Sequence, residues 1–303
     1  MAIATGVFRV NTQLKYMENN KYNIGIVGLG LLGGSLGKAF IQKTPHTIFG
    51  CDKDFLIIQK AIETKAIHKE LNDKTLPYLD MLIFAINPRM TVEVMPKYIK
   101  DLKNGCIVTD VGGVKKQVME CFARLAGKNE NLHFIGAHPM AGKEVSGLEN
   151  STADLFKNAS MLYMPVTSSE KHIGLFKQFF ADIGFSSLVK TTHQEHDKII
   201  AYTSQLAHCV SSAYCLHSLA PQHEGFSAGS FKDLTRVAKM NENMWTELFC
   251  DNKDNLVAAI DEFIKQLNSF REAIKKGDEE NLREIIKTGT KRKESLWKHE
   301  SHR

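Results

Sequence analysis

Short apolar runs alternate with helix-compatible stretches over the first two thirds of the chain. The apolar runs fall at residues 24–27, 47–51, 78–86, 106–111, 132–137, 161–166 and 185–189. Short buried strands separated by helices are typical of a mostly parallel, doubly wound sheet. The pattern therefore predicts an α/β domain over residues 21–190.

The pattern changes after Thr191, because no convincing alternating strand follows and the spacing of apolar residues becomes helical. The clearest example comprises Leu256, Ile260, Phe263, Ile264, Leu267 and Phe270. We therefore predict an all-α domain over residues 191–303, with Thr191 or Thr192 capping its first helix and Glu195 in the opening turn. Residues 1–20 have no clear amphipathic period, and we expect a loosely ordered N-terminal extension.

A glycine-rich turn follows the first apolar run. Its sequence is Gly28-Leu29-Gly30-Leu31-Leu32-Gly33, and Asp52 ends the next run. In a Rossmann-type dinucleotide site the first glycine permits the turn, the second admits the pyrophosphate, and the third lets the helix approach the sheet. Asp52 follows at about the 20-residue spacing of the acid that binds the ribose 2′-hydroxyl, which favours NAD over NADP. Lys43 and Lys53 nearby weaken that preference.

Composition narrows the class of protein further. A chain of 303 residues with 43% hydrophobic residues can form two packed domains. The net charge of +5 is mild, and we interpret the basic segment 291–293 as a solvated helix end, not a nucleic-acid site. No apolar run reaches the roughly 20 residues of a membrane helix, and no secretory signal is evident, so we expect a cytoplasmic protein without a membrane partner. The six cysteines contain no C-x-x-C pair and predict reduced core residues, not disulfides or a metal site.

Two loops at predicted strand ends carry polar side chains. The segment Thr109 to Lys115 contains Asp110, Gly112 and Gly113, and follows one apolar run. Ligands of doubly wound folds bind at this edge of the sheet, although the segment is also compatible with a plain strand-to-helix turn. His138 follows the next run and precedes a proline, which favours an extended backbone. Histidine accepts protons near neutral pH, so His138 is a candidate base, with a merely structural histidine as the alternative.

Two helical segments add further candidates. Ser204 and His208 lie one helical turn apart, as do Asp233 and Arg236. An arginine can bind a carboxylate through two parallel hydrogen bonds. The alternative for Asp233 and Arg236 is an exposed ion pair of little energetic weight.

Taken in order, these motifs resemble the prephenate dehydrogenase family of tyrosine biosynthesis. The resemblance rests on the glycine turn, Asp-Val-Gly-x-Val-Lys, His-Pro-x-Ala-Gly-x-Glu, Glu-His-Asp before Ser-x-Leu-x-His, and Gly-x-Phe-x-Asp-x-Thr-Arg before Met-Trp, and it runs from about Tyr22 to Trp245. It implies a Rossmann domain followed by a helical dimerisation domain, and therefore a homodimer. It also implies NAD-dependent oxidation of a small-molecule substrate, prephenate, to 4-hydroxyphenylpyruvate and carbon dioxide.

The resemblance also implies roles for individual residues. His138 matches the catalytic base at the ring hydroxyl, Arg236 matches the carboxylate anchor, and Ser204 and His208 match polar residues of the pocket. The surrounding shell would comprise Gly113, Lys143, Glu144, Gly229, Lys232, Asp233 and Trp245, with Glu144 and Asp233 pairing with Arg236. The cofactor site would comprise Gly28, Leu29, Gly30, Leu31, Leu32, Gly33, Asp52, Asp110 and Gly112. No metal is implied.

One departure concerns the histidine. The family commonly has a serine where this chain has Gly113, and that hydroxyl helps to orient the catalytic histidine. Another donor or a water takes its place here, or His138 is less well oriented.

Alternative functions remain open from the sequence. Arogenate dehydrogenase is the nearest, because arogenate differs from prephenate only in an amino group replacing the side-chain keto group. A β-hydroxyacid dehydrogenase shares the two-domain plan but normally uses a lysine of the helical domain, and the His138 motif argues against it. A cofactor-binding sensor without catalysis is a third reading, and it is favoured only by Gly113.

Overall fold

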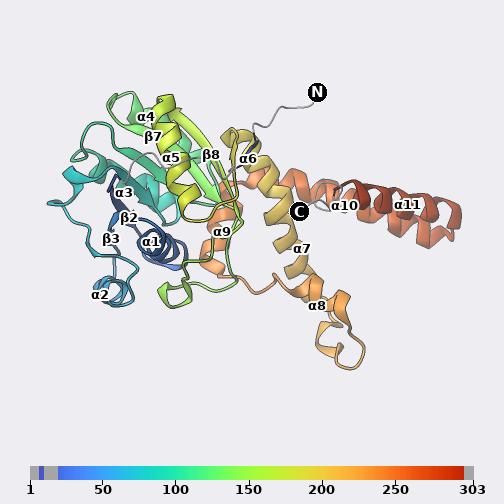
Figure 1. The fold of residues 1–303 in the computed structure, drawn as a ribbon. Coiled ribbons are helices and arrows are strands. Elements are labelled where there is room, and N and C mark those ends of the chain that lie inside the picture. The colour runs from blue at the N-terminus through green and yellow to red at the C-terminus, as the bar shows by residue number, and fades with distance from the viewer. Residues whose placement is uncertain (1–6, 10–19, 297–303) are drawn as a thin grey trace.

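The computed structural model describes residues 7–9 and 20–296. A sheet covered by helices forms the first part, and an elongated set of helices extends from one side of it (Figure 1). This arrangement confirms the predicted fold class, an α/β Rossmann-type domain followed by a helical domain.

In the described residues the sheet has nine strands in the order β1-β9-β8-β7-β6-β5-β2-β3-β4. Pairing is parallel from β7 through β6, β5, β2 and β3 to β4, and between β8 and β9, whereas β7 pairs with β8 and β1 with β9 antiparallel. The strands are β1 (Val7–Arg9), β2 (Asn23–Val27), β3 (Thr47–Cys51), β4 (Lys69–Glu70), β5 (Met81–Phe84), β6 (Ile107–Asp110), β7 (His133–Pro139), β8 (Ser160–Thr167) and β9 (Ser187–Lys190).

The first strand corrects part of the sequence analysis. We expected a loosely ordered extension over residues 1–20, but Val7–Arg9 pairs antiparallel with β9, opposite Val189, Leu188 and Ser187. The partner of this short edge strand lies at the far end of the domain, so no local pattern indicated the pairing. Residues 1–6 and 10–19 of that predicted extension lie outside the described residues.

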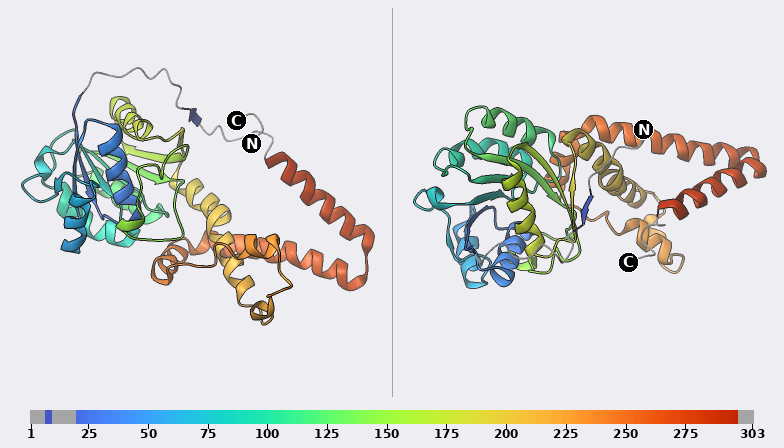
Figure 2. Two further views of the ribbon diagram at one scale, coloured as in Figure 1. Left: turned by 60° about the horizontal axis from the view of Figure 1, so that its bottom comes forward. Right: turned by 45° about the horizontal axis from the view of Figure 1, so that its top comes forward.

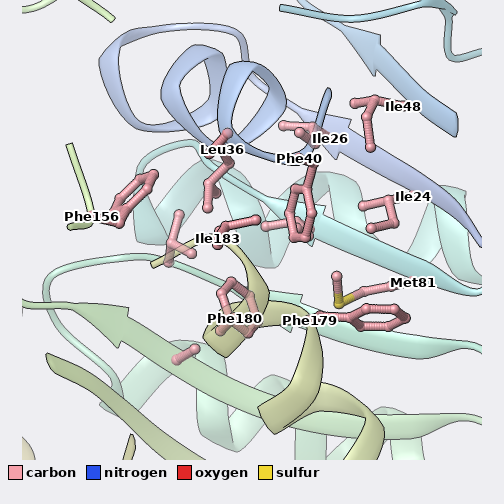
Figure 3. Packing of buried hydrophobic residues seen from close by; sticks show 14 of the residues in the cluster. Ile24, Ile26, Leu36, Phe40, Ile48, Met81, Phe156, Phe179, Phe180 and Ile183 are labelled. Atoms are coloured by element: carbon pink, nitrogen blue, oxygen red, sulfur yellow. The ribbon is translucent and has the colours of Figure 1, made fainter. Parts of the chain in front are cut away.

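Helices cover both faces of the sheet. The core on one face includes residues of α1 (Leu31–Lys43), α2 (Phe55–Glu63) and α5 (Glu170–Asp182), with Phe40, Phe179 and Phe180 at its centre (Figure 3). The opposite core includes residues of α3 (Pro88–Ile99) and α4 (Lys116–Ala126). Two buried faces explain why the strands are continuous apolar runs instead of alternating ones.

The helical part begins directly after the last strand. Thr192 caps α6, because its side chain accepts a hydrogen bond from the Glu195 amide at 3.2 Å. A single π-helical turn, η3, then leads into α7. The elements are α6 (His193–Ile200), η3 (Ala201–Gln205), α7 (Leu206–Cys215), the short 3₁₀-helix η4 (Ala220–Gln222), α8 (Gly229–Thr235), α9 (Glu242–Asp251), α10 (Lys253–Lys276) and α11 (Glu279–Leu296).

The last two helices form a hairpin that projects away from the sheet (Figure 2). The predicted helical spacing is realised in α10, but its apolar side chains stay largely exposed: Phe263 at 39%, Ile264 at 48% and Leu267 at 58%. None of the helices in the described ranges is apolar over a length that would cross a bilayer.

The cysteine prediction is correct only in part. All six cysteines are free, and Cys106 and Cys121 are buried as expected. Cys215 and Cys250 are exposed, because both lie on helices of the second part that this single chain leaves uncovered.

Candidate functional site

The glycine turn has the backbone that a dinucleotide site requires. Gly28 has a φ of +91°, a conformation that L side chains rarely adopt, and its amide donates to the Cys51 carbonyl at 2.8 Å. A Cβ at Gly33 would overlap the Gly28 carbonyl oxygen, so the close approach of α1 to the turn depends on glycine there. A Cβ at Gly30 would meet nothing within 4 Å. The turn therefore leaves open space where α1 begins, at Leu31 and Leu32, and a phosphate fits that position.

Asp52 lies beside this turn. Its Oδ2 accepts a hydrogen bond from the Leu29 amide at 2.9 Å, and its Oδ1 accepts from the Asp54 amide at 3.2 Å. The carboxylate is thus fixed at the end of β3, where it can accept from a ribose hydroxyl and would repel a 2′-phosphate. Lys43 is engaged elsewhere, since its ammonium contacts Asp154 and the carbonyls of Ala153 and Ile183.

Asp110 and Lys115 form an ion pair inside the protein. Their side chains are 1% and 0% exposed. Lys115 also donates to the Ala137 carbonyl at 2.6 Å, and Asp110 accepts from the Gly112 amide at 2.8 Å. Burial lowers the pKa of Lys115, although the neighbouring Asp110 carboxylate opposes that change. The pair joins the ends of β6 and β7, directly before His138.

His138 is the outer member of a hydrogen-bonded series that we call the His–His–Asp network, comprising His138, His196 and Asp197. The Nδ1 of His138 lies 2.8 Å from the Nε2 of His196, and the Nδ1 of His196 lies 2.7 Å from the Oδ1 of Asp197. His138 comes from the end of β7, whereas the other two residues come from α6. The network thus crosses between the two parts of the molecule.

Asp197 is held from two sides. Its carboxylate accepts from the backbone amides of Lys115 and Lys116, both at 2.9 Å, and so caps the beginning of α4. Its carbonyl accepts from the Asn252 side chain at 2.8 Å, and the same amide group donates to the Gln205 side chain at 2.7 Å. Asp197 and Asn252 are both buried, so this arrangement is shielded from competing water.

Burial dominates the protonation of these histidines. It lowers the pKa of His138 well below its ordinary value, and His196 and Lys115 lower it further. Burial also lowers the pKa of His196, against the opposing hydrogen bond to Asp197. Both rings are therefore neutral at pH 7, and a neutral ring can accept a proton.

Helix α9 connects the His–His–Asp network with a second cluster of predicted site residues, which comprises Ser204, His208, Arg236 and Trp245. A Cβ at Gly113 would lie 3.9 Å from the Nε2 of His138 and 3.7 Å from the Leu248 side chain. One turn earlier on α9, the Trp245 ring packs on His208, with ring centroids 3.8 Å apart and planes tilted by 31°. Residues one turn apart share a helix face, so the two histidine clusters adjoin along α9.

The second cluster also contains Arg236. Its Nη1 lies 2.6 Å from the Oε1 of Glu144, and the two side chains are 65% and 48% exposed. Burial lowers the pKa of His208, and Arg236 lowers it further, whereas the Ser204 carbonyl, 2.9 Å from its Nδ1, raises it, as does Glu144. Ser204 itself lies in the π-helical turn, a feature that often marks functional sites.

The remaining residues of the predicted substrate shell lie at the surface. Gly229, Lys232 and Asp233 lie on the short helix α8 and are exposed. Lys143 is exposed and donates to the Asn150 carbonyl at 2.9 Å. Of the two acids expected to pair with Arg236, the structure places Glu144 there.

Sequence reasoning assigned no role to His196, Asp197 or Lys115. His196 and Asp197 lie in the Glu-His-Asp motif that contributed to the family resemblance, so a signal was present. The contact of His196 with His138, 58 residues earlier in the chain, forms only in the folded protein, where α6 packs against α4. Lys115 ends the Asp-Val-Gly-x-Val-Lys motif, but nothing local distinguished it as a buried residue from the exposed Lys116 beside it.

Comparison with known families covers most of the chain. The family model described as prephenate dehydrogenase, nucleotide-binding domain, matches residues 36–189. The model described as prephenate dehydrogenase, dimerization domain, matches residues 192–288. The prediction of a nucleotide cofactor agrees with the first match, and the predicted enzyme class, an oxidoreductase, is confirmed.

Individual relatives agree with the family models. Prephenate dehydrogenase of Lactococcus lactis subsp. cremoris is 28% identical over 90% of this chain and 77% of its own length. Cyclohexadienyl dehydrogenase of Zymomonas mobilis subsp. mobilis is also 28% identical, over 90% of this chain and 96% of its own. The structure of prephenate dehydrogenase from Aquifex aeolicus with hydroxyphenyl propionate and NAD+ superposes with a TM-score of 0.78 at 29% identity, covering 91% of this chain and 98% of that one. The chain therefore belongs to the prephenate dehydrogenase family.

Proposed function

We propose that this protein oxidises prephenate with NAD to 4-hydroxyphenylpyruvate and carbon dioxide. The observation that carries the proposal is the position of His138: its Nδ1 is engaged by His196, while its Nε2 faces Gly113, which has no side chain. A neutral imidazole with one nitrogen held and the other open is suited to accept a proton from a bound hydroxyl.

The residues then divide the reaction between them. NAD, held by the turn of residues 28–33 and by Asp52, would supply the acceptor for the hydride of the ring carbon that carries the hydroxyl group. His138 accepts the hydroxyl proton at Nε2 as that carbon becomes a carbonyl. The bond between the ring and its carboxylate then breaks and its electrons make the ring aromatic, so the ring oxygen recovers a proton from His138 as carbon dioxide leaves. Much of the driving force lies in this aromatisation. The protein mainly aligns the substrate with the cofactor and removes the proton of the ring hydroxyl.

Arg236 is the proposed anchor for a substrate carboxylate. Its guanidinium group can bind a carboxylate with two parallel hydrogen bonds. Glu144 holds it in the protein alone, and a substrate carboxylate can replace this exposed partner at small cost, because exposed ion pairs contribute only about 0–1 kcal/mol. His208 and Ser204 beside it offer polar contacts to the same anion, and Trp245 offers an aromatic wall.

NAD fits the cofactor site better than NADP. Asp52 is fixed at the end of β3, and Lys43, which could have bound a 2′-phosphate, is occupied by Asp154 and two carbonyl groups. The Aquifex aeolicus structure that resembles this one contains NAD+. Gly28, Gly30 and Gly33 supply the turn that would hold the pyrophosphate.

The active protein is proposed to be a homodimer. Helix α10 leaves Phe263, Ile264 and Leu267 on its surface, and these side chains are more exposed than a stable monomer favours. They lie within residues 192–288, which match the model of a dimerization domain. Sedimentation equilibrium is expected to give twice the chain mass, and a monomeric mass at micromolar concentration would contradict this part of the proposal.

Initial rates of cofactor reduction test the function. NAD and NADP are each supplied with prephenate and with arogenate, for the wild type and for His138→Asn. We expect the wild type to be fastest with NAD and prephenate. We expect the substitution to lower kcat by about 10²- to 10⁴-fold, the usual contribution of a general base. His172→Asn, which alters a histidine stacked on His133 at a distant surface, is the matched control and should keep the wild-type rate.

Other outcomes would separate the alternatives. A higher kcat/KM with arogenate would replace the proposed substrate but keep the roles of His138 and Arg236. NAD binding without reduction, with either substrate, would refute the dehydrogenase reaction and favour a binding protein. An active His138→Asn variant would refute the proposed base alone.

A further inference from the structure

We infer that His196 and Asp197 position His138 and fix the proton of its ring on Nδ1, so that Nε2 is the atom that accepts the substrate proton. The inference rests on the proposed function, in which His138 is the base. It concerns two buried residues that do not need to touch the substrate, so both are positioning residues.

The direction of each hydrogen bond follows from the Asp197 end of the network. Backbone amides can only donate, and those of Lys115 and Lys116 already point at the two carboxylate oxygens of Asp197. A carboxylate accepts, so the His196 Nδ1, 2.7 Å from Oδ1, must carry the hydrogen. The Nε2 of a neutral His196 is then a bare acceptor.

The second step transfers this constraint to His138. Its Nδ1 lies 2.8 Å from that bare Nε2, so it must donate, and the hydrogen of the neutral ring is placed on Nδ1. The Nε2 of His138 is left with a lone pair, on the side that faces Gly113. The opposite tautomer would lose the bond to His196 and would present an N–H to the substrate hydroxyl.

The charges around His196 favour its neutral form. The titratable groups that face it are Asp197 on its own helix, Lys115 at the beginning of α4, Asp110 on β6 and the ring of His138. Lys115 and Asp110 neutralise one another as a buried pair. Burial therefore prevails and lowers the pKa of His196, despite the hydrogen bond to Asp197.

Because residue 113 is a glycine, the orientation of the His138 ring depends more strongly on the His–His–Asp network. A serine at this position would place a hydroxyl close to the Nε2 of His138, because its Cβ would lie 3.9 Å away. With glycine, the ring has one side-chain hydrogen bond among the described residues, the one from Nδ1 to His196. Asn252 and Gln205 brace the other end of the network, so the anchor is itself rigid.

Steady-state kinetics of three variants test the positioning role. His196→Leu removes the acceptor, His196→Gln keeps an amide oxygen near the former Nε2, and His193→Leu alters a histidine on the first turn of the same helix as the matched control. We expect His196→Leu to lower kcat about 10- to 100-fold with KM for substrate and cofactor within about twofold, the scale known for residues that orient a reactive group. His196→Gln should recover most of the loss, and His193→Leu should match the wild type.

The result that overturns the inference is equally specific. A merely structural His196 would make the leucine and glutamine variants lose activity together, with parallel losses in melting temperature. Equal kcat in wild type and His196→Leu would also refute the positioning role.

Nuclear magnetic resonance separates this inference from the proposed function, because it requires no turnover. In long-range ¹H–¹⁵N spectra of protein labelled at histidine, His138 and His196 should both carry their hydrogen on Nδ1. An Nε2-protonated His138 in an active wild type would refute the inference alone. An inactive wild type with both rings protonated on Nδ1 would refute the proposed function and leave the hydrogen-bond assignment standing.

Discussion

The two ends of the candidate site are built in opposite ways. At the histidine end, His138 is tied to buried partners, and Lys115 beneath it has no exposed side-chain surface. At the arginine end, Arg236 is 65% exposed and pairs with Glu144, which is 48% exposed. A group that moves a proton benefits from fixed geometry, whereas a group that binds an anion must be reachable and able to exchange partners. The difference in burial therefore matches the roles that we propose, proton transfer at the histidine end and anion binding at the arginine end.

The largest effect is expected at the buried end, from Lys115→Met. The substitution keeps the volume but leaves the Asp110 carboxylate buried without its ammonium partner. Removing one member of a buried pair typically costs about 3–5 kcal/mol. Denaturant unfolding followed by circular dichroism measures the loss in free energy of unfolding.

Two controls define what that loss means. Lys116→Met changes an exposed neighbour whose backbone amide, not its side chain, contacts Asp197, and it should cost under about 0.5 kcal/mol. Adding Asp110→Asn to Lys115→Met should recover much of the stability, because the isolated charge is then removed. A loss in Lys115→Met as small as that in Lys116→Met would show that the buried end is not held by this ion pair.

Lys115 and Lys116 also show which features of the structure could be predicted from the sequence and which could not. The glycine turn and Asp52 were recognisable because their roles depend on local backbone conformation and spacing, such as the positive φ of Gly28. The strands and helices followed from periodicity. Lys115 and Lys116 are chemically identical, and only contacts with Asp110 and Ala137, made after the sheet assembles, bury the first and leave the second exposed.

In the candidate site, too, local features could be predicted from the sequence and contacts between distant segments could not. His138 could be proposed because a strand end and a following proline are local features. The role of His196 could not, because its ring reaches His138 only when α6 packs beside β7, and spacing along the chain carries no information on that contact. The pairing of β1 with β9 was missed for the same reason, because it joins two segments that lie far apart in the sequence.

A smaller effect is expected at the exposed end, from Arg236→Gln. The variant removes the charge but keeps hydrogen-bond donors, so the site loses about 2 kcal/mol of binding to a carboxylate. This corresponds to a KM for prephenate raised about 30-fold, with kcat changed by less than about threefold. Steady-state kinetics at saturating NAD measure both constants.

The comparison between the histidine end and the arginine end is tested by whether Arg236→Gln changes KM or kcat. Lys239→Gln, an exposed cation shortly after Arg236, is a matched control and should leave KM within about twofold of the wild type. A loss confined to kcat in Arg236→Gln would place the arginine at the reacting atoms and remove the distinction between the two ends.

The pH dependence of kcat/KM is expected to show a smaller difference. An ordinary histidine with a pKa of about 6.5 is roughly three-quarters protonated at pH 6, and a base of that kind would lose about fourfold in rate. The pKa of His138 is lowered by burial, so the ring stays neutral and active as pH falls through 6.5. The acid limb of kcat/KM should thus lie below pH 6.5, and a limb at or above that value would contradict the lowered pKa of this base.

The smallest effect is expected from Glu144→Gln. An exposed ion pair contributes about 0–1 kcal/mol, so the free energy of unfolding should stay within about 0.5 kcal/mol of the wild type. The same change removes a carboxylate that competes with the substrate for Arg236, and KM for prephenate should therefore fall, by up to about fivefold. Kinetics at low and high salt check the cause, because the advantage should shrink as ionic strength screens the exposed charges. A raised KM would instead mean that Glu144 holds Arg236 in its binding position, which would make the exposed end as preorganised as the buried one.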